Sequence, residues 1–201
     1  MDAFDQTWVI GNVEALRRAR GDKLAPCCRV IANIADMEGY KARRALIQAG
    51  APEALVAAVN EALREDPVRE DVISVACKAI ELLAKNAYPS LPPSNGAPCA
   101  MVQVVSNPFV GLSIKACACR AIVRLTGPKC AAALVVAGAR EALVAALNDA
   151  IQASDTRLLA AACGALLRLS VNFIEIGSGA PTALVSAVRE SARLNDADAL
   201  A

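Results

Sequence analysis

The seven residues Gly-Ala-Pro-Glu-Ala-Leu-Val at positions 50–56 decide the fold, because close copies of them return three times along the chain. The copies read Gly-Ala-Pro-Cys-Ala-Met-Val at 96–102, Gly-Ala-Arg-Glu-Ala-Leu-Val at 138–144 and Gly-Ala-Pro-Thr-Ala-Leu-Val at 179–185. Successive copies start 46, 42 and 41 residues apart. A period near 40 is typical of stacked helical units, none of which buries its apolar face alone. The sequence therefore predicts a solenoid, an architecture that usually presents a long binding surface.

Each copy predicts a sharp turn followed by an amphipathic helix. Leu55, Val59 and Leu63 follow one another at a spacing of four, which places them on one helix face. The leading Gly suits the turn, and three copies carry Pro just inside the helix start, where its missing N–H costs nothing. A short stretch (40–49 or 129–137) precedes two of the copies. Each copy and its flanks thus predict a three-helix unit.

The following helix of each unit is predicted to start at an N-cap, at Asp66, Asn107 or Asp155. It runs through a second repeated phrase, which is headed by Cys28, Cys77, Cys119 and Cys163. In every copy an Ile or Leu lies three residues after the Cys and another apolar residue lies six after it, which is one helix face. We therefore expect these cysteines in the core, where a small, soft side chain suits a tight helix contact.

A metal site built from Cys27 with Cys28, or Cys117 with Cys119, is the competing interpretation of the cysteines. Zinc sites usually bring Cys-x-x-Cys pairs or His partners, and the chain has neither spacing nor any His. We expect no metal, no disulfide framework and no cofactor.

Amino-acid composition further narrows the class of protein. The chain has 201 residues, of which 56% are hydrophobic and 3% aromatic, and its 21 Lys and Arg nearly balance 20 Asp and Glu. This balance does not draw the protein to nucleic acid. No segment reaches the ~18 uninterrupted apolar residues of a membrane span, and the acidic start of the chain does not read as a signal peptide. We expect an intracellular, cytoplasmic protein.

The three-helix pattern resembles the armadillo repeat over almost the whole chain. That family has a short first helix ending in Gly, a second beginning Gly-Ala-x-x-x-Leu-Val, and a third with a small residue before an Ala-Leu-x-Asn-Leu phrase. Here Ala79-Ile80, Ala121-Ile122 and Ala165-Leu166 stand at the Ala-Leu positions. The short stretches before each Gly favour armadillo over the two-helix HEAT repeat. The resemblance implies an all-α, right-handed α-solenoid of armadillo-like three-helix repeats, with approximate units 1–36 (partial), 37–86, 87–126, 127–172 and 173–201 (partial).

In armadillo proteins the third helices line a concave groove, and the resemblance assigns groove positions here. They are the residue after the repeated Cys and the one four later, and peptide-binding members carry Asn at the second of these. The corresponding residues that we assign to partner binding are Arg29, Asn33, Lys78, Leu82, Arg120, Arg124 and Arg168. Only Asn33 keeps the family's Asn, which argues against a receptor for basic peptides.

The basic residues of this row suggest the opposite ligand, an acidic peptide or an acidic helix. Guanidinium groups on a rigid scaffold form bidentate bonds with carboxylates. The competing interpretation is that these side chains pair with Glu and Asp of neighbouring repeats. Two other basic clusters, around Arg17 and Arg43, are predicted to be solvated helix faces.

Two functions remain open on these grounds. The first is a non-catalytic scaffold that binds a partner segment along the groove. The second is a structural subunit of a large assembly, held by neighbouring subunits through its incomplete ends and outer faces. An enzyme is not expected, because the chain lacks His, a phosphate loop and a nucleophile elbow. We expect no small-molecule substrate.

The proline-rich residues 88–95 interrupt one unit and predict a loop where a first helix would stand.

Overall fold

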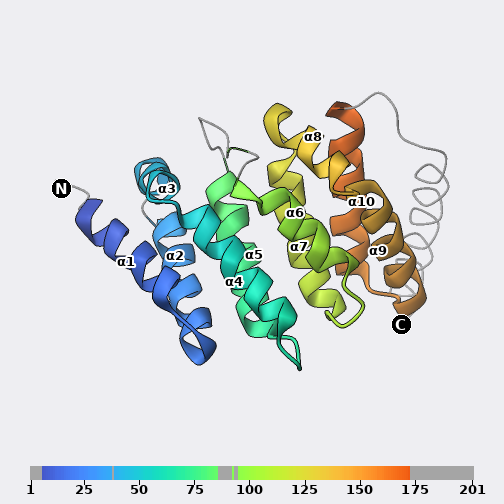
Figure 1. Ribbon diagram of the computed structural model, residues 1–201. Helices are drawn as coiled ribbons and strands as arrows, with labels where there is room; N and C mark the ends of the chain where they lie inside the picture. The colour runs from blue at the N-terminus through green and yellow to red at the C-terminus, as the bar shows by residue number, and fades with distance from the viewer. Residues whose placement is uncertain (1–5, 38, 86–91, 93–94, 173–201) are drawn as a thin grey trace, which may run out of the picture.

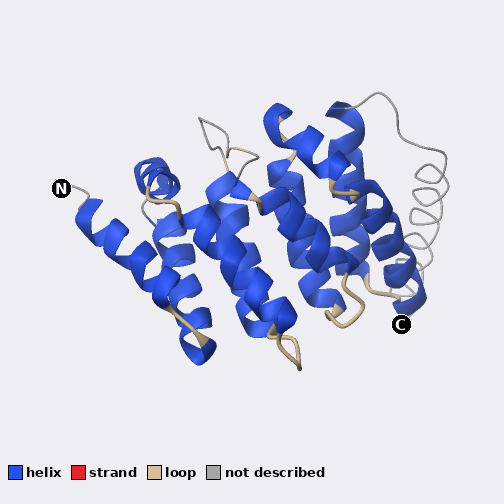
Figure 2. Cartoon of the chain, viewed as in Figure 1, coloured by secondary structure: helices blue, strands red, loops and turns tan. Residues whose placement is uncertain are grey.

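The computed structural model describes residues 6–37, 39–85, 92 and 95–172. Over this part of the chain the ordered elements are helices, and no strand occurs (Figure 2). The helices are α1 (Gln6–Arg18), η1 (Gly21–Lys23, a 3-10 turn), α2 (Leu24–Met37), α3 (Gly39–Gln48), α4 (Ala51–Arg64), α5 (Glu70–Ala84), α6 (Ala97–Ser106), α7 (Leu112–Leu125), α8 (Pro128–Val136), α9 (Ala139–Ala153) and α10 (Thr156–Asn172). The predicted all-α fold is confirmed.

The helices stack in two layers along the chain (Figure 1). The second helices of the units, α1, α4, α6 and α9, pack on one another in order, and so do the third helices, α2, α5, α7 and α10. The short helices α3 and α8 lie along one edge, uppermost in Figure 1. Two units, α3–α5 and α8–α10, thus have all three helices. Residues 173–201 and most of 88–95 lie outside the described residues, and so does the fourth copy of the Gly-Ala phrase.

The turn before each second helix depends on glycine. Gly50, Gly96 and Gly138 have φ angles of 81°, 76° and 80°, the left-handed region that other residues enter only under strain. Pro52 and Pro98 stand in the first turn of α4 and α6. Both observations confirm what the Gly-Ala phrase predicts.

Two of the three predicted starts of third helices are wrong. α5 begins at Glu70 and α7 at Leu112, several residues after Asp66 and Asn107. Asn107 Oδ1 accepts a hydrogen bond from the N–H of Phe109 at 2.8 Å, which closes a turn instead of capping a helix. Asp155 is the N-cap of α10 as predicted, since its Oδ1 accepts from the N–H groups of Arg157 and Leu158, both at 2.9 Å.

Three of the four repeated cysteines are fully buried. Burial raises the pKa of the Cys28 and Cys119 thiols to about 12 and also raises the pKa of Cys77. Cys163 is half-buried. The predicted core position of Cys28, Cys77 and Cys119 is confirmed, and their thiols stay protonated.

Alanine fills the joints between third helices. The position two residues after the repeated Cys holds Ala79, Ala121 and Ala165, and all three are fully buried. A methyl side chain there lets neighbouring helices approach closely. Val30 has the same position in α2 and is 38% exposed, because no described helix packs on that side of α2.

A buried ion pair joins the last two units. Lys115 Nζ of α7 lies 2.7 Å from Asp149 Oδ2 of α9. The lysine side chain is 8% exposed, whereas the aspartate is 40% exposed. The lysine therefore depends on this partner much more than the aspartate does.

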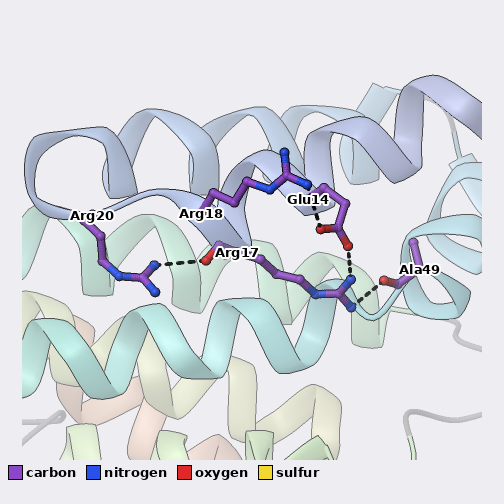
Figure 3. Close-up of polar contacts among 5 residues, drawn as sticks. All are labelled: Glu14, Arg17, Arg18, Arg20 and Ala49. Atoms are coloured by element: carbon purple, nitrogen blue, oxygen red, sulfur yellow. Dashed lines mark hydrogen bonds and ion pairs between the residues drawn. The ribbon is translucent and has the colours of Figure 1, made fainter.

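Arginines bind backbone carbonyls at the first joint (Figure 3). The Arg17 guanidinium donates a hydrogen bond to the Ala49 carbonyl at 2.8 Å and also pairs with Glu14. Arg43 of α3 donates in the same way to the carbonyl of Ala35 in the preceding unit and to that of Lys85 in its own unit, at 2.7 and 3.2 Å. The prediction that these clusters are merely solvated is wrong for Arg17 and Arg43, because free carbonyls at helix ends need donors.

No single described helix is long and apolar enough to cross a membrane. Cys130–Val136 and Ala139–Ala153 meet the length and composition required only when taken together, and the break between them bends by 70°.

Candidate partner-binding face on the third helices

The residues assigned to partner binding come from four helices that lie side by side, α2, α5, α7 and α10 (Figure 1). Six of the seven are exposed, and we call the surface that they form the third-helix face: Arg29, Asn33, Lys78, Arg120, Arg124 and Arg168. The stacking of the helices therefore brings five cations from four units onto one surface.

Leu82 is the exception. It is only 5% exposed and belongs to the core, so its assignment as a groove contact does not fit the structure. α5 packs between α2 and α7, and Leu82 is part of the apolar core there. The equivalent Arg124 of α7 is exposed.

A carboxylate that the sequence assignment missed lies in the middle of the third-helix face. Glu81 Oε2 is 3.6 Å from Lys78 Nζ on its own helix and 3.8 Å from Arg120 Nε on α7. The Glu81 side chain is 15% exposed. The spacing of three between Lys78 and Glu81 is a signal that could have indicated the first pair. The pair with Arg120 depends on how α5 and α7 stack.

Glu81 shares its one negative charge between two cations, so this part of the face keeps a positive balance. The Arg120 guanidinium also donates a hydrogen bond to Cys117 Sγ at 3.1 Å, which fixes its direction along α7. The interpretation that the cations pair with neighbouring repeats therefore holds for Arg120, whose partner is on α5.

Arg29 and Arg124 differ from Lys78 and Arg120, which both pair with Glu81. Neither makes an ion pair or a side-chain hydrogen bond with any part of the described chain. Both guanidinium groups therefore keep all their donors available to carboxylates of another molecule.

A hollow of moderate size lies in the layer of second helices. It has a volume of about 480 Å³ and lies between the ends of α4 and α6. Its lining includes the polar side chains of Asn60, Arg64 and Gln103, together with Phe109 from the loop that follows α6. No predicted partner-binding residue lines it.

Among the described residues, no group of three or more His, Cys, Asp or Glu side chains could hold a metal ion.

Comparison with known proteins identifies the architecture. No protein-family model matches the chain, and no curated protein matches it. Computationally designed armadillo repeat proteins for modular peptide recognition superpose with a TM-score of 0.67 at 21% identity, covering 90% of this chain and 81% of theirs. The fold is that of armadillo repeats.

Two further structures agree with this armadillo fold. An engineered protein superposes with a TM-score of 0.66 at 22% identity, over 89% of this chain and 67% of its own. A designed armadillo repeat protein in complex with the peptide (KR)4 superposes with a TM-score of 0.63 at 20% identity, over 90% of this chain and 81% of its own. At such identities the likeness concerns the armadillo fold alone. The predicted armadillo resemblance is confirmed at that level.

Proposed function

We propose that this armadillo-like solenoid is a non-catalytic protein-interaction scaffold whose third-helix face binds an extended segment rich in Asp and Glu. The observation that carries the proposal is the pair of unpartnered guanidinium groups, Arg29 and Arg124, on a surface that also holds Lys78 and Arg120. The whole chain has a net charge of +1, so the positive potential comes from the placement of these residues and not from composition.

The arrangement of the cations supports an extended ligand. They come from four helices of successive units, with Arg120 and Arg124 both on α7, so carboxylates along one strand of peptide would reach one cation after another. Arginine suits this contact, because its planar guanidinium forms two parallel hydrogen bonds with a carboxylate. Glu81 adds specificity, because it leaves Lys78 and Arg120 partly neutralised and directs the strongest attraction toward Arg124.

The designed relative with a (KR)4 peptide provides a sharp contrast. A peptide of that charge would meet like charges on the third-helix face of this chain. We therefore expect a peptide of the same length with alternating Asp and Glu to bind, and (KR)4 not to bind.

Fluorescence anisotropy with these two labelled peptides tests the proposal. The acidic peptide should bind, with an affinity that falls as salt rises. Replacing Arg120 and Arg124 together with Glu should lower that affinity at least about tenfold, the equivalent of ~1.4 kcal/mol.

A matched control carries the same charge change away from the face. Arg44 of α3 and Arg64 of α4 are exposed and unpartnered, so Arg44→Glu with Arg64→Glu should leave peptide affinity nearly unchanged. Equal losses in both double variants would show that only net charge matters and would contradict a site on the third helices. Binding of (KR)4 in place of the acidic peptide would also contradict it.

The alternative is a structural subunit held by neighbours through its outer faces and ends. Large apolar side chains exposed on the outside, Phe109 after α6 and Val136 at the end of α8, favour it. Under this alternative the isolated chain aggregates at concentrations where a scaffold would remain dispersed, and light scattering distinguishes the two.

A further inference from the structure

The N-terminal end of the solenoid exposes an apolar stripe on α2. Val30 and Met37 are 38% and 82% exposed, and both lie on the side of α2 opposite the buried Cys28 and Ile31. Asn33 lies between them at spacings of three and four, so the three residues form one stripe. We call this surface, with the neighbouring part of α1, the N-terminal end face.

In the other described units the corresponding surface is covered. Ala79, Ala121 and Ala165 correspond to Val30, and each is buried in a third helix that packs on the third helix of the preceding unit. On α1 the buried Val9 and Val13 correspond to Leu55 and Val59 of α4. Trp8 therefore corresponds to Ala54.

Trp8 is 51% exposed, whereas Ala54 is buried. Terminal units of solenoids usually carry a polar outer face, so exposed Trp8, Val30 and Met37 are unusual for an end that faces water. The larger side chains also differ from the alanines that let one armadillo unit approach the next. The Trp8 ring is much larger than the Ala54 methyl group, so this face differs in shape from the faces on which the described units stack.

The stripe is self-complementary. Val30 and Met37 are seven residues apart, and so are Arg29 and Asp36 on the adjoining edge. Seven residues are two helical turns. A two-fold axis between Asn33 and Ile34 reverses α2 of a second copy, so that Val30 faces Met37 of that copy. Arg29 then lies about 3 Å along the helix axis from the level of that copy's Asp36, within reach of the long arginine side chain.

Both charges are available for such a pair. Arg29 and Asp36 are exposed and make no ion pair within the described chain. The same axis brings α1 against α1, where the large Trp8 ring would meet the small side chains at Gly11 and Ala15. Size and charge thus both complement a second copy of this same surface.

We propose that the N-terminal end face is a homodimer interface, in which α2 of two copies pack antiparallel through Val30 and Met37, with reciprocal Arg29–Asp36 ion pairs. The interface is limited to two helices of ~20 Å each, which is small for a stable dimer. The dimer should therefore be weak and dissociate on dilution. The dimer would withdraw Arg29 and Asn33 from the third-helix face, so it would compete with peptide binding at that end of the face and leave Arg124 available.

Sedimentation velocity over a wide dilution series tests the interface on the full chain. The mass should rise from the 20.8 kDa of one chain toward twice that value with increasing concentration. Val30→Glu should keep the chain monomeric throughout. Val136→Glu on α8 is the matched control, because it adds the same charge at another exposed valine and should leave dimerisation unchanged.

A charge swap tests the register. Arg29→Asp or Asp36→Arg alone places like charges opposite each other and should weaken the dimer at least fivefold. The double variant restores opposite charges and should recover most of the affinity. A wild-type chain that stays monomeric at every concentration would overturn the proposal, and so would a dimer that Val30→Glu leaves intact. A dimer weakened by Val30→Glu but not rescued by the charge swap would overturn the antiparallel register.

Discussion

At the inner joints of the solenoid, alanine stands two residues after the repeated Cys, and Ala79, Ala121 and Ala165 are fully buried. At the N-terminal end the same position holds Val30, which is 38% exposed. The two regions have the same helical register and the same core face, so the difference lies in what packs on the other side. A small residue stands where a neighbouring third helix packs closely, and a larger residue stands where no described helix covers the position.

The largest expected effect on the free energy of unfolding comes from introducing a glutamate at an inner joint, and the same substitution at the N-terminal end is the comparison. Ala121→Glu buries a carboxylate between α5 and α7 without a partner and should destabilise the fold by about 3–5 kcal/mol. Val30→Glu leaves the same group in water and should change the stability of the monomer by no more than about 0.5 kcal/mol. Urea unfolding of dilute protein measures both. Similar losses would show that the N-terminal end is covered in solution.

The second comparison concerns the ion pairs of the two regions. Asp149→Asn should cost about 2 kcal/mol, because it leaves the buried Lys115 ammonium without its carboxylate. Lys115→Met should cost less, because Met fits the buried site and Asp149 is exposed enough to stay hydrated. At the N-terminal end Glu14→Gln removes only exposed pairs and should cost under about 1 kcal/mol. Thermal unfolding of the three variants should reproduce this order, and a larger loss for Lys115→Met than for Asp149→Asn would contradict the burial argument.

A third comparison is between the stability costs of alanine at two glycine turns, Gly50 near the N-terminal end and Gly138 at an inner unit. Gly50 and Gly138 have nearly the same φ, so alanine at either should cost about 1–2 kcal/mol of backbone strain. A Cβ at Gly50 would also meet Arg17 Nη2 and disturb its hydrogen bond to Ala49, whereas a Cβ at Gly138 finds only an ordinary contact. Gly50→Ala should therefore cost about 1 kcal/mol more.

A double-mutant cycle checks the origin of that excess. In an Arg17→Ala background the two glycine substitutions should cost the same, because the competing side chain is gone. An excess that persists would point to the backbone of residue 50 and not to Arg17.

The smallest expected effect is the pH dependence of stability that comes from the contact between η1 and the start of α5. Arg69 bonds to Asp71 at the start of α5 and lies 3.5 Å from Asp22 of η1. The hydrogen bond from Arg69 holds the pKa of Asp71 below its ordinary value of 3.8. The resulting stability is present above pH 3.8 and is lost as the pH falls through the lowered pKa.

Asp71→Asn should remove a small part of the acid sensitivity of the fold. Unfolding midpoints between neutral pH and the acid limb measure it, with Asp66→Asn as the control, because Asp66 makes no ion pair in the described chain. An identical acid limb in wild type and Asp71→Asn would show that the pair with Arg69 does not contribute.

Most of the fold could be predicted because its signals are local. Gly50, Gly96 and Gly138 indicated left-handed turns, and the spacing of apolar residues after each repeated Cys indicated the core side of the third helices. The wrong helix starts at Asp66 and Asn107 arose because an Asn or Asp before a helix can close a turn as readily as it caps one. At Asn107 the chosen partner is the N–H of Phe109.

The candidate site could be predicted only in part. Its cations were found by register alone, and six of the seven assigned residues are exposed. The position of Leu82 could not be predicted in this way, because that register lies at the border between the face and the preceding unit. Glu81 was missed as the common partner of Lys78 and Arg120, because the sequence separates it from Arg120 by 39 positions.

By itself, the sequence determined that this chain repeats, that its units are helical, and which side of each helix is apolar. These properties follow from the spacing of residues along a single helix or turn. Tertiary structure alone decided which charges are paired and which are free, because Arg120 meets Glu81 and Arg17 meets Ala49 only when separate units stack. It also decided that Val30 is exposed while Ala79 is buried. Burial depends on the neighbouring helix, and no periodicity within one helix specifies whether that neighbour is present.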